Sequence, residues 1–483
     1  MHKLKKYLNI YSLFFLIAII FGSLFALFTP YLWGVDETTQ FARVYQISEG
    51  HLTSEYFGDQ QKSFGHEGYG GYIPTSLLNL IKLTDNNLAS PGFIGHEQPI
   101  GWVTNAQAYN KMGSEKFSKK HSVYTFTNTS SYSPAAYAPS LVGLEFSKFL
   151  NFNMGLSIIT SRLFDLIFYC TCTLIGLWVL SFTRAKWLLF AVALIPQSLY
   201  QASIVSADAV VNALALLYSA LLVKTVIFRR ELTRSQSLLL FVCLIVMPIT
   251  KPTYIFLDAL ALSIPSAHIF DFKFKNVFKF GSLVLGLGLF AWWTKLTAGV
   301  AKTIGLMAPV PWSIHWSHQQ IVFLMERPFS FILIIIRTLT IQDNDMFHQL
   351  IGSFGFNAVQ IPAIATVATI VSLSVAFIII DKSPSISEKK LWYFIIILGT
   401  SIVSIFATLY ITFTEPKYPV VNGVQGRYFL PFVFIVLILL ATSKYLRPVI
   451  TKSQYKFAPL IISGLIIFSL VVSFSKFFYI TWG

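Results

Sequence analysis

The sequence predicts an all-α polytopic membrane protein, and three observations support this fold class. Hydrophobic residues make up 55% of the 483-residue chain, whereas charged residues make up only 12%. Apolar runs long enough to cross a bilayer recur along the chain. Basic residues gather in every second loop between these runs, as they do in cytoplasmic loops. The chain is therefore expected to form one integral-membrane domain over residues 1–483.

About eleven apolar runs are predicted to be transmembrane helices. The first run follows the basic segment MHKLKKYLNI without a small-residue cleavage site, so we expect it to be retained as a span. Two neighbouring runs are short, and Pro248 and Pro252 favour a break in or between them. Three cysteines lie in apolar runs and are expected to pack there. The predicted spans are residues 9–33, 155–181, 187–205, 207–228, 236–250, 253–270, 277–298, 361–380, 391–413, 429–446 and 457–480.

The basic residues also predict the orientation of the spans. Lys and Arg number 36 against 21 Asp and Glu, which gives a net charge of +15. Because this excess lies in alternate loops, it indicates cytoplasmic loops and argues against a nucleic-acid partner. The alternation predicts a cytoplasmic N-terminus and an extracytoplasmic C-terminus. The residues concerned are Lys3, Lys5, Lys6, Arg184, Lys186, Arg229, Arg230, Arg234, Lys273, Lys275, Lys279, Lys382, Lys389, Lys390, Lys444, Arg447, Lys452 and Lys456.

Two long segments are then placed on the extracytoplasmic side. Residues 34–154 form a large first loop whose later part, SYSPAAYAPSLVGLEFSKFL, is apolar enough to form interfacial helices. Residues 299–360 form a second extracytoplasmic or re-entrant region. Its apolar stretch at 329–341 is too short to cross the bilayer.

A carboxylate pair follows the first apolar run directly. Asp36 and Glu37 lie where the chain leaves the hydrocarbon. A helix that begins at Asp36 would place Gln40 and Arg43 on the same face as that acid. The functional interpretation is a catalytic base, or a pair of acids that holds Mg²⁺ or Mn²⁺. The alternative is that Asp36 only caps the helix.

The stretch NGVQGRYFLPF at residues 422–432 contains a second set of polar residues at the same predicted boundary. Gln425 and Arg427 lie at the start of the tenth predicted span, and arginine suits bidentate contact with phosphate. Gly426 would let a ligand approach the backbone closely. The alternative is that Arg427 only reaches the lipid headgroups from the end of a span.

A buried cation at the predicted outer end of the fifth span needs an anion. Lys251, in ITKPTYIF, could pair with a lipid phosphate or with Asp208, although Asp208 could equally cap the fourth span. Inside the second span, Arg162 and Asp165 are spaced to neutralise each other. The other unusual polar residues lie on one side of the membrane, which favours an enzyme or a ligand-binding protein over a channel.

Five stretches together resemble a family of bacterial multi-span proteins catalogued as a domain of unknown function. They are VDETTQFARVYQISEGHL, SYSPAAYAPS, KPTYIF, IGSFGF and VQGRYFLP, and they occur in order along nearly the whole chain. That family resembles the C-type integral-membrane glycosyltransferases, called GT-C. GT-C enzymes carry an acidic residue or pair near the start of a large first outer loop. The chain departs from the expected pattern in having Val35 in place of a proline and Gln40 in place of a histidine.

The resemblance implies an inverting glycosyltransferase in the bacterial plasma membrane. A polyprenyl-phosphate-linked sugar would be the donor, and a surface glycan or a teichoic-acid-like polymer would be the acceptor. Asp36 or Glu37 would act as the base, with a divalent metal ion optional. The alternatives are a flippase for lipid-linked saccharide and a non-catalytic scaffold of a polysaccharide assembly complex. The expected substrate-binding residues are Gln40, Arg43, Tyr132, Tyr137, Lys251, Gln425 and Arg427.

Overall fold

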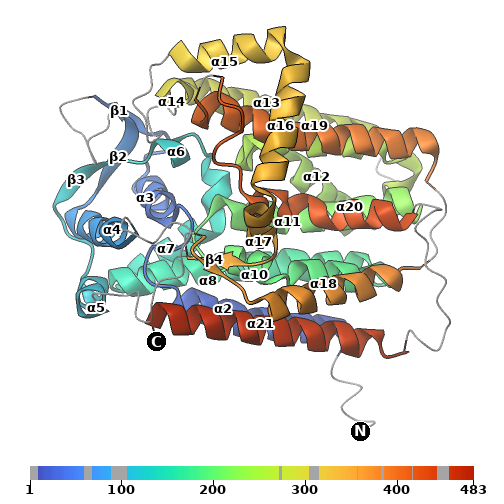
Figure 1. Cartoon of the computed structure of the whole chain (residues 1–483), viewed down its shortest axis with the longest axis horizontal. Helices are drawn as coiled ribbons and strands as arrows, with labels where there is room; N and C mark the ends of the chain where they lie inside the picture. The colour runs from blue at the N-terminus through green and yellow to red at the C-terminus, as the bar shows by residue number, and fades with distance from the viewer. Residues whose placement is uncertain are drawn as a thin grey trace.

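The computed structural model shows a bundle of long helices with a smaller mixed region at one end (Figure 1). The mixed region contains α3 to α7 and a small sheet, on the left of that view. The described residues are 9–58, 68–88, 106–270, 275–303, 315–355, 357–381, 386–415, 417–442 and 456–482. Several residues used to predict the orientation lie outside the described residues, namely Lys3, Lys5, Lys6, Lys273, Lys382, Lys444, Arg447 and Lys452.

Within these ranges, six helices are long and apolar enough to cross a membrane. A helix rises about 1.5 Å per residue, so helices of this length match the thickness of the hydrocarbon layer. They support the prediction of a polytopic membrane protein. The six are α2 (Ile10–Phe28), α8 (Met154–Val179), α11 with the π-helical turn η3 (Ala207–Ile227), α13 (Lys275–Leu296), α19 (Glu388–Phe413) and α21 (Ala458–Trp482).

The remaining predicted spans are shorter helices or are broken in two. The span predicted at 187–205 is split, because Pro196 lacks the amide that would continue α9. Pro248 stays inside α12, and the chain breaks instead at Lys251, after which Pro252 starts a 3-10 helix. These elements are α9 (Ala185–Ala193), α10 (Pro196–Ala202), α12 (Arg234–Thr250), η4 (Pro252–Ser263), α18 (Ala363–Ile378) and α20 (Leu430–Thr442).

The segment between α2 and α8 is not wholly helical, which corrects the all-α prediction. It contains an antiparallel sheet in the order β1-β2-β3. Strand β2 has the sequence GYGGYIP, and sequence patterning does not reveal it because glycine is depleted in strands. The glycines allow close packing, since a side chain at Gly70 would collide with the Tyr124 carbonyl and one at Gly71 would meet Gln46. The elements are α3 (Glu37–Ser48), β1 (Glu55–Phe57), β2 (Gly68–Pro74), α4 (Thr75–Leu88), α5 (Ala106–Ser114), β3 (His121–Thr125), α6 (Thr127–Ser130), η2 (Pro134–Tyr137) and α7 (Ala138–Phe149).

In the residues that the structure describes between α13 and α18, the chain forms short helices and a short strand pair. Helix α16 is 14 residues long and runs across the long helices rather than along them (Figure 1). Phe329, Leu333 and Ile336 lie exposed on one of its faces, which suits contact with lipid at an interface. The elements are α14 (Ala298–Thr303), α15 (His315–Glu326), α16 (Pro328–Ile341), α17 (Asp343–Ile351), β4 (Ser353–Phe354) and β5 (Val359–Gln360).

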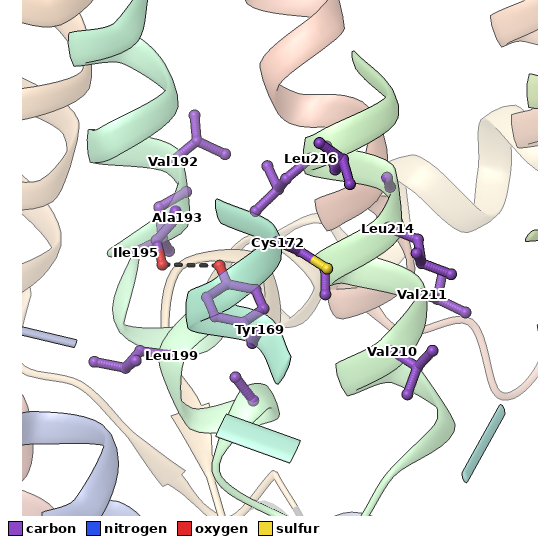
Figure 2. Close-up of a cluster of buried hydrophobic side chains, with 14 of the residues drawn as sticks. Tyr169, Cys172, Val192, Ala193, Ile195, Leu199, Val210, Val211, Leu214 and Leu216 are labelled. Carbon is purple, nitrogen blue, oxygen red and sulfur yellow. Dashed lines mark hydrogen bonds between the residues drawn. The ribbon is translucent and has the colours of Figure 1, made fainter. Parts of the chain in front are cut away.

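The core of the bundle surrounds α11, which is buried on all sides. Figure 2 shows the apolar cluster where α8, α9 and α11 meet. The Tyr169 hydroxyl donates a hydrogen bond of 2.9 Å to the Ala193 carbonyl, so this polar group is satisfied within an apolar region. Cys172 packs in the same cluster, and Cys170 and Cys243 are also buried and free, which confirms the expected packing role.

An ion pair joins two loops at the far end of α8 from Met154. The Arg184 guanidinium Nε and the Arg184 amide each donate to the Asp381 carboxylate at 2.6 Å. Burial alone would raise the pKa of Asp381, but these bonds, the Thr183 hydroxyl and the charge of Arg184 outweigh it and lower the pKa. The pair therefore fastens the loop after α8 to the loop after α18.

Candidate functional site

Four segments that are far apart in the sequence meet at one end of the bundle. Helix α3 begins beside Asp36, α11 begins beside Asp208, and α12 ends before Lys251. The 3-10 helix η7 (Gly426–Phe429), which leads into α20, carries Arg427. We call Asp36, Asp208, Lys251 and Arg427 the charged cluster.

The charged cluster is a chain of alternating charge. Arg427 Nη1 donates to Asp208 Oδ2 at 3.0 Å, and Arg427 Nη2 donates to Asp36 Oδ2 at 3.1 Å. Lys251 Nζ donates to Asp208 Oδ1 at 2.5 Å. The predicted pairing of Lys251 with Asp208 is therefore confirmed. Capping is the wrong interpretation for Asp208, because Ser206 caps α11.

The charged cluster is buried at Arg427 and Asp208 and partly exposed to solvent at Asp36. The Arg427 side chain is 2% exposed and Asp208 is 9% exposed, whereas the Asp36 side chain is 34% exposed. Arg427 Nε also donates to Gln425 Oε1 at 2.5 Å, which fixes the plane of the guanidinium. A molecule that enters from solvent therefore meets Asp36 first and Arg427 directly behind it.

The backbone at Asp36 is held in the left-handed region, with φ at 58°. Residues other than glycine, asparagine and aspartate rarely adopt this conformation. Although Asp36 occupies the position before α3, its carboxylate makes no capping hydrogen bond. The interpretation of Asp36 as a helix cap is therefore wrong, and the chain instead directs this carboxylate toward Arg427.

Tyrosine rings surround the ammonium group of Lys251. Its Nζ lies 4.6 Å from the ring centre of Tyr428, 5.9 Å from that of Tyr132 and 6.0 Å from that of Tyr254. The negative faces of these rings attract a cation at this position. Burial, followed by the charges of Asp208 and Asp36, raises the pKa of Tyr132, so this phenol keeps its proton and remains a hydrogen-bond donor.

Glu37 does not share the site with Asp36, which corrects the prediction of a catalytic or metal-binding pair. Its side chain is fully buried and accepts from Arg162 Nε at 2.7 Å and from Arg162 Nη2 at 2.6 Å. It also accepts from the amides of Gly34 and Val205 at 2.8 and 2.9 Å. A carboxylate has about four lone-pair positions, so none is left for a substrate proton or a metal ion.

The same bonds correct the predicted pairing within α8. Arg162 contacts Glu37 and the carbonyls at the end of α2 rather than Asp165. Asp165 accepts from the Ser140 hydroxyl at 2.6 Å. Glu37 and Arg162 therefore fasten the C-terminal end of α2 to α8 and position Asp36, the residue before Glu37. In the described residues, no group of three metal-ligating side chains occurs.

Gln40, Tyr137 and Arg43 lie in the wall behind the site. The Tyr137 hydroxyl donates to Gln40 Oε1 at 2.5 Å, and the same oxygen accepts from the Ala207 amide. Arg43 is fully buried and donates to Gln46 and to the Leu52 carbonyl, both at 2.5 Å. Burial lowers the pKa of Arg43 to about 10, so it stays charged at neutral pH. The sequence predicts direct contact of these three residues with substrate. In the structure, their polar groups instead form hydrogen bonds within the chain.

Gly426 is required by packing rather than by a ligand. A side chain there would collide with the Met346 carbonyl of α17, and the Gly426 amide donates to Gln349 Oε1 at 2.8 Å. Helix α17 therefore packs directly on the segment that carries Arg427. The predicted approach of a ligand to this backbone is wrong.

An apolar pocket of about 520 Å³ lies next to this contact, between α17, α18 and α20. It begins one turn from the Gly426 contact on α17 and continues along α20, the helix that follows Arg427. Its lining is almost wholly aliphatic and aromatic, so it suits a hydrocarbon chain. The lining residues include Phe347, Leu350, Leu373, Phe377, Val433 and Leu437.

A comparison with known protein families identifies the family of the chain. A family model described as "Predicted membrane protein (DUF2142)" matches residues 19–436. The chain belongs to the DUF2142 family. The match spans α2 to α20 and so includes every residue of the charged cluster. No curated protein and no solved structure matched the chain.

Sequence reasoning overlooked two contributors to the site of this DUF2142 member. Tyr254 and Tyr428 lie within the stretches KPTYIF and VQGRYFLP that carry Lys251 and Arg427, and this proximity was the available signal. Arg162 was recognised as unusual, but its partner lies 125 residues away in sequence. Helical spacing can reveal only local partners.

Proposed function

We propose that this DUF2142 member is an inverting glycosyltransferase that takes a sugar from a polyprenyl-phosphate carrier. The observation that carries the proposal is the charged cluster, in which the partly exposed Asp36 carboxylate contacts the buried Arg427 and Asp208 joins Arg427 to Lys251. A base and an anion site side by side are the two requirements for transferring a sugar away from a phosphate. The apolar pocket between α17, α18 and α20 would provide a place for the lipid tail.

In the proposed reaction, Asp36 accepts the proton of an acceptor hydroxyl. The hydroxyl oxygen attacks the anomeric carbon, and the bond between that carbon and the phosphate oxygen breaks. The electron pair of this bond passes to the lipid phosphate. Arg427 and Lys251 stabilise the charge that develops there. Direct displacement inverts the configuration of the anomeric carbon.

The proposal includes a membrane arrangement like that of GT-C enzymes. About eleven helices would cross the bacterial plasma membrane, with broken helices such as α9 and α10 counted as single crossings. The charged cluster would face outward beneath the large first loop. The acceptor would then be a surface glycan or a teichoic-acid-like polymer.

Arg427→Ala is expected to remove one sugar from the envelope glycan of the host. Loss of a single group that stabilises developing charge typically slows a reaction by about 100-fold to 1000-fold. The measurement is glycan composition and linkage in a deletion strain complemented with the wild type or a variant, at equal protein levels in the membrane. Arg184→Ala is the matched control, because it removes an arginine from an ion pair at the other end of the bundle.

The same complemented strains, together with a transport assay, distinguish the proposed glycosyltransferase from a scaffold and from a flippase. A glycan restored by Arg427→Ala would overturn the assignment of chemistry and favour a scaffold. Lipid-linked saccharide that crosses the membrane in proteoliposomes, with no new glycosidic bond, would favour a flippase. Loss of the sugar in both Arg427→Ala and Arg184→Ala would point to a folding defect.

Leu373→Trp is expected to weaken the binding of polyprenyl phosphate by filling the apolar pocket. The loss should be about tenfold, the effect of leaving roughly two CH₂ groups unburied. Val371→Trp is the matched control, because Val371 lies on the same helix with an exposed side chain. Equal binding by both variants would show that the tail does not enter this pocket. Binding can be measured by titration of the purified protein in detergent.

A further inference from the structure

The two acids that contact Arg427 are held very differently. Asp208 bonds both Arg427 and Lys251 and is nearly inaccessible to solvent. Asp36 meets Arg427 at 3.1 Å and is one-third exposed, and among the described residues it has no second cation. Asp208 is therefore the permanent anchor of both cations, whereas Asp36 is the replaceable partner.

The contact between Asp36 and Arg427 joins the two groups to which the proposed function gives separate roles. The lone pair of Oδ2 that accepts from Arg427 cannot accept the proton of an acceptor hydroxyl at the same time. The N–H of Arg427 Nη2 that donates to Asp36 likewise cannot donate to a phosphate oxygen at the same time. A phosphate oxygen that takes this N–H from Asp36 would free the carboxylate, so we interpret the contact as that of a resting state.

Charge balance indicates what can separate them. The cluster contains two acids and two cations, so it is neutral, and a partly buried site resists uncompensated charge. An anion that takes the place of Asp36 on Arg427 keeps the interior neutral only if it carries one negative charge. A phosphodiester between a sugar and a lipid alcohol carries one charge, whereas the corresponding diphosphate carries two.

We propose that Asp36 occupies the phosphate position on Arg427 in the resting protein, and that a lipid phosphodiester with one negative charge displaces it and so frees it as the base. This inference rests on the proposed function and makes it more specific. It assigns a carrier with one phosphate, and it makes activation of the acceptor depend on prior binding of the donor.

The test is binding of two probes to the purified full-length protein in detergent. The probes are a polyprenyl methyl phosphodiester, with one charge, and the corresponding polyprenyl methyl diphosphate, with two. Asp36→Asn removes the competing carboxylate, so it should bind the phosphodiester about fivefold more tightly than the wild type. Asparagine tolerates the left-handed backbone, so the variant should keep its fold.

Glu49→Gln is the matched control, because it removes an acid from the end of α3 that is paired with Lys148 rather than Arg427. It should bind the phosphodiester as the wild type does. Equal or weaker binding by Asp36→Asn would overturn the inference, as would the same gain in Glu49→Gln. If the wild type bound the diphosphate more tightly than the phosphodiester, the assignment of a carrier with one phosphate would be overturned.

Arg427→Ala distinguishes failure of this inference from failure of the proposed function. If neither probe binds the wild type, or if Arg427→Ala binds as well as the wild type, the phosphate site itself is wrong. If Arg427→Ala loses binding while Asp36→Asn gains none, the phosphate site stands and only the displacement is wrong.

Discussion

Asp36→Asn is expected to slow glycosyl transfer by about a thousandfold while leaving the protein folded. The estimate is the middle of the range for loss of a positioned general base. An amide has no negative charge and cannot accept the proton of the acceptor hydroxyl. The measurement is the rate at which envelope glycan gains the missing sugar after induction of the variant in a deletion strain.

Asparagine is the appropriate replacement because of the left-handed backbone at this position. Alanine would add backbone strain of about 1 kcal/mol or more to the loss of the carboxylate and so mix two effects. A variant with wild-type levels in the membrane and a wild-type rate would exclude Asp36 as the base. Slow transfer together with normal levels would support the proposal.

Glu37→Gln is expected to lower the free energy of unfolding by about 3–5 kcal/mol, the usual cost of breaking a buried ion pair from one side. The substitution leaves the Arg162 guanidinium without its counter-ion in a site that is closed to water. The neighbouring Asp36→Asn change should cost far less, because that side chain is partly exposed. Thermal unfolding of the two purified variants in detergent provides the comparison.

The double variant Glu37→Gln with Arg162→Met separates a structural from a catalytic role. Removing both charges should recover part of the stability that the single change loses, since no unpaired charge remains. Transfer activity should recover in parallel if Glu37 acts only by holding the chain. A stable double variant without transfer activity would indicate a catalytic role for Glu37.

The sequence predicts the large features of the fold because they depend on local composition. Apolar runs locate the long helices, and Pro252 indicates one break in the chain, whereas Pro248 stays inside α12. The small sheet escapes detection because close packing requires glycines in β2, and these remove the usual strand signal. The length of a run also does not determine whether it forms one helix or two, as α9 and α10 illustrate.

The residues of the site were predicted better than their roles. Position at a membrane boundary was enough to single out Asp36, Lys251 and Arg427, because charges there need partners. The roles of neighbouring acids depend on which side chain meets them in three dimensions. Asp36 and Glu37 are adjacent in the chain, yet one faces Arg427 and the other faces Arg162. No periodicity in the sequence carries that information.

The long sequence separations within the charged cluster impose an order on biosynthesis. Lys251 follows Asp208 by 43 residues, so these two charges can pair soon after their helices leave the ribosome. Arg427 follows Asp36 by 391 residues, so it arrives only when the chain is nearly complete. A truncated chain would thus contain a neutralised Asp208 but no anion site. Translation must therefore pass η7 before the phosphate site that we propose is complete.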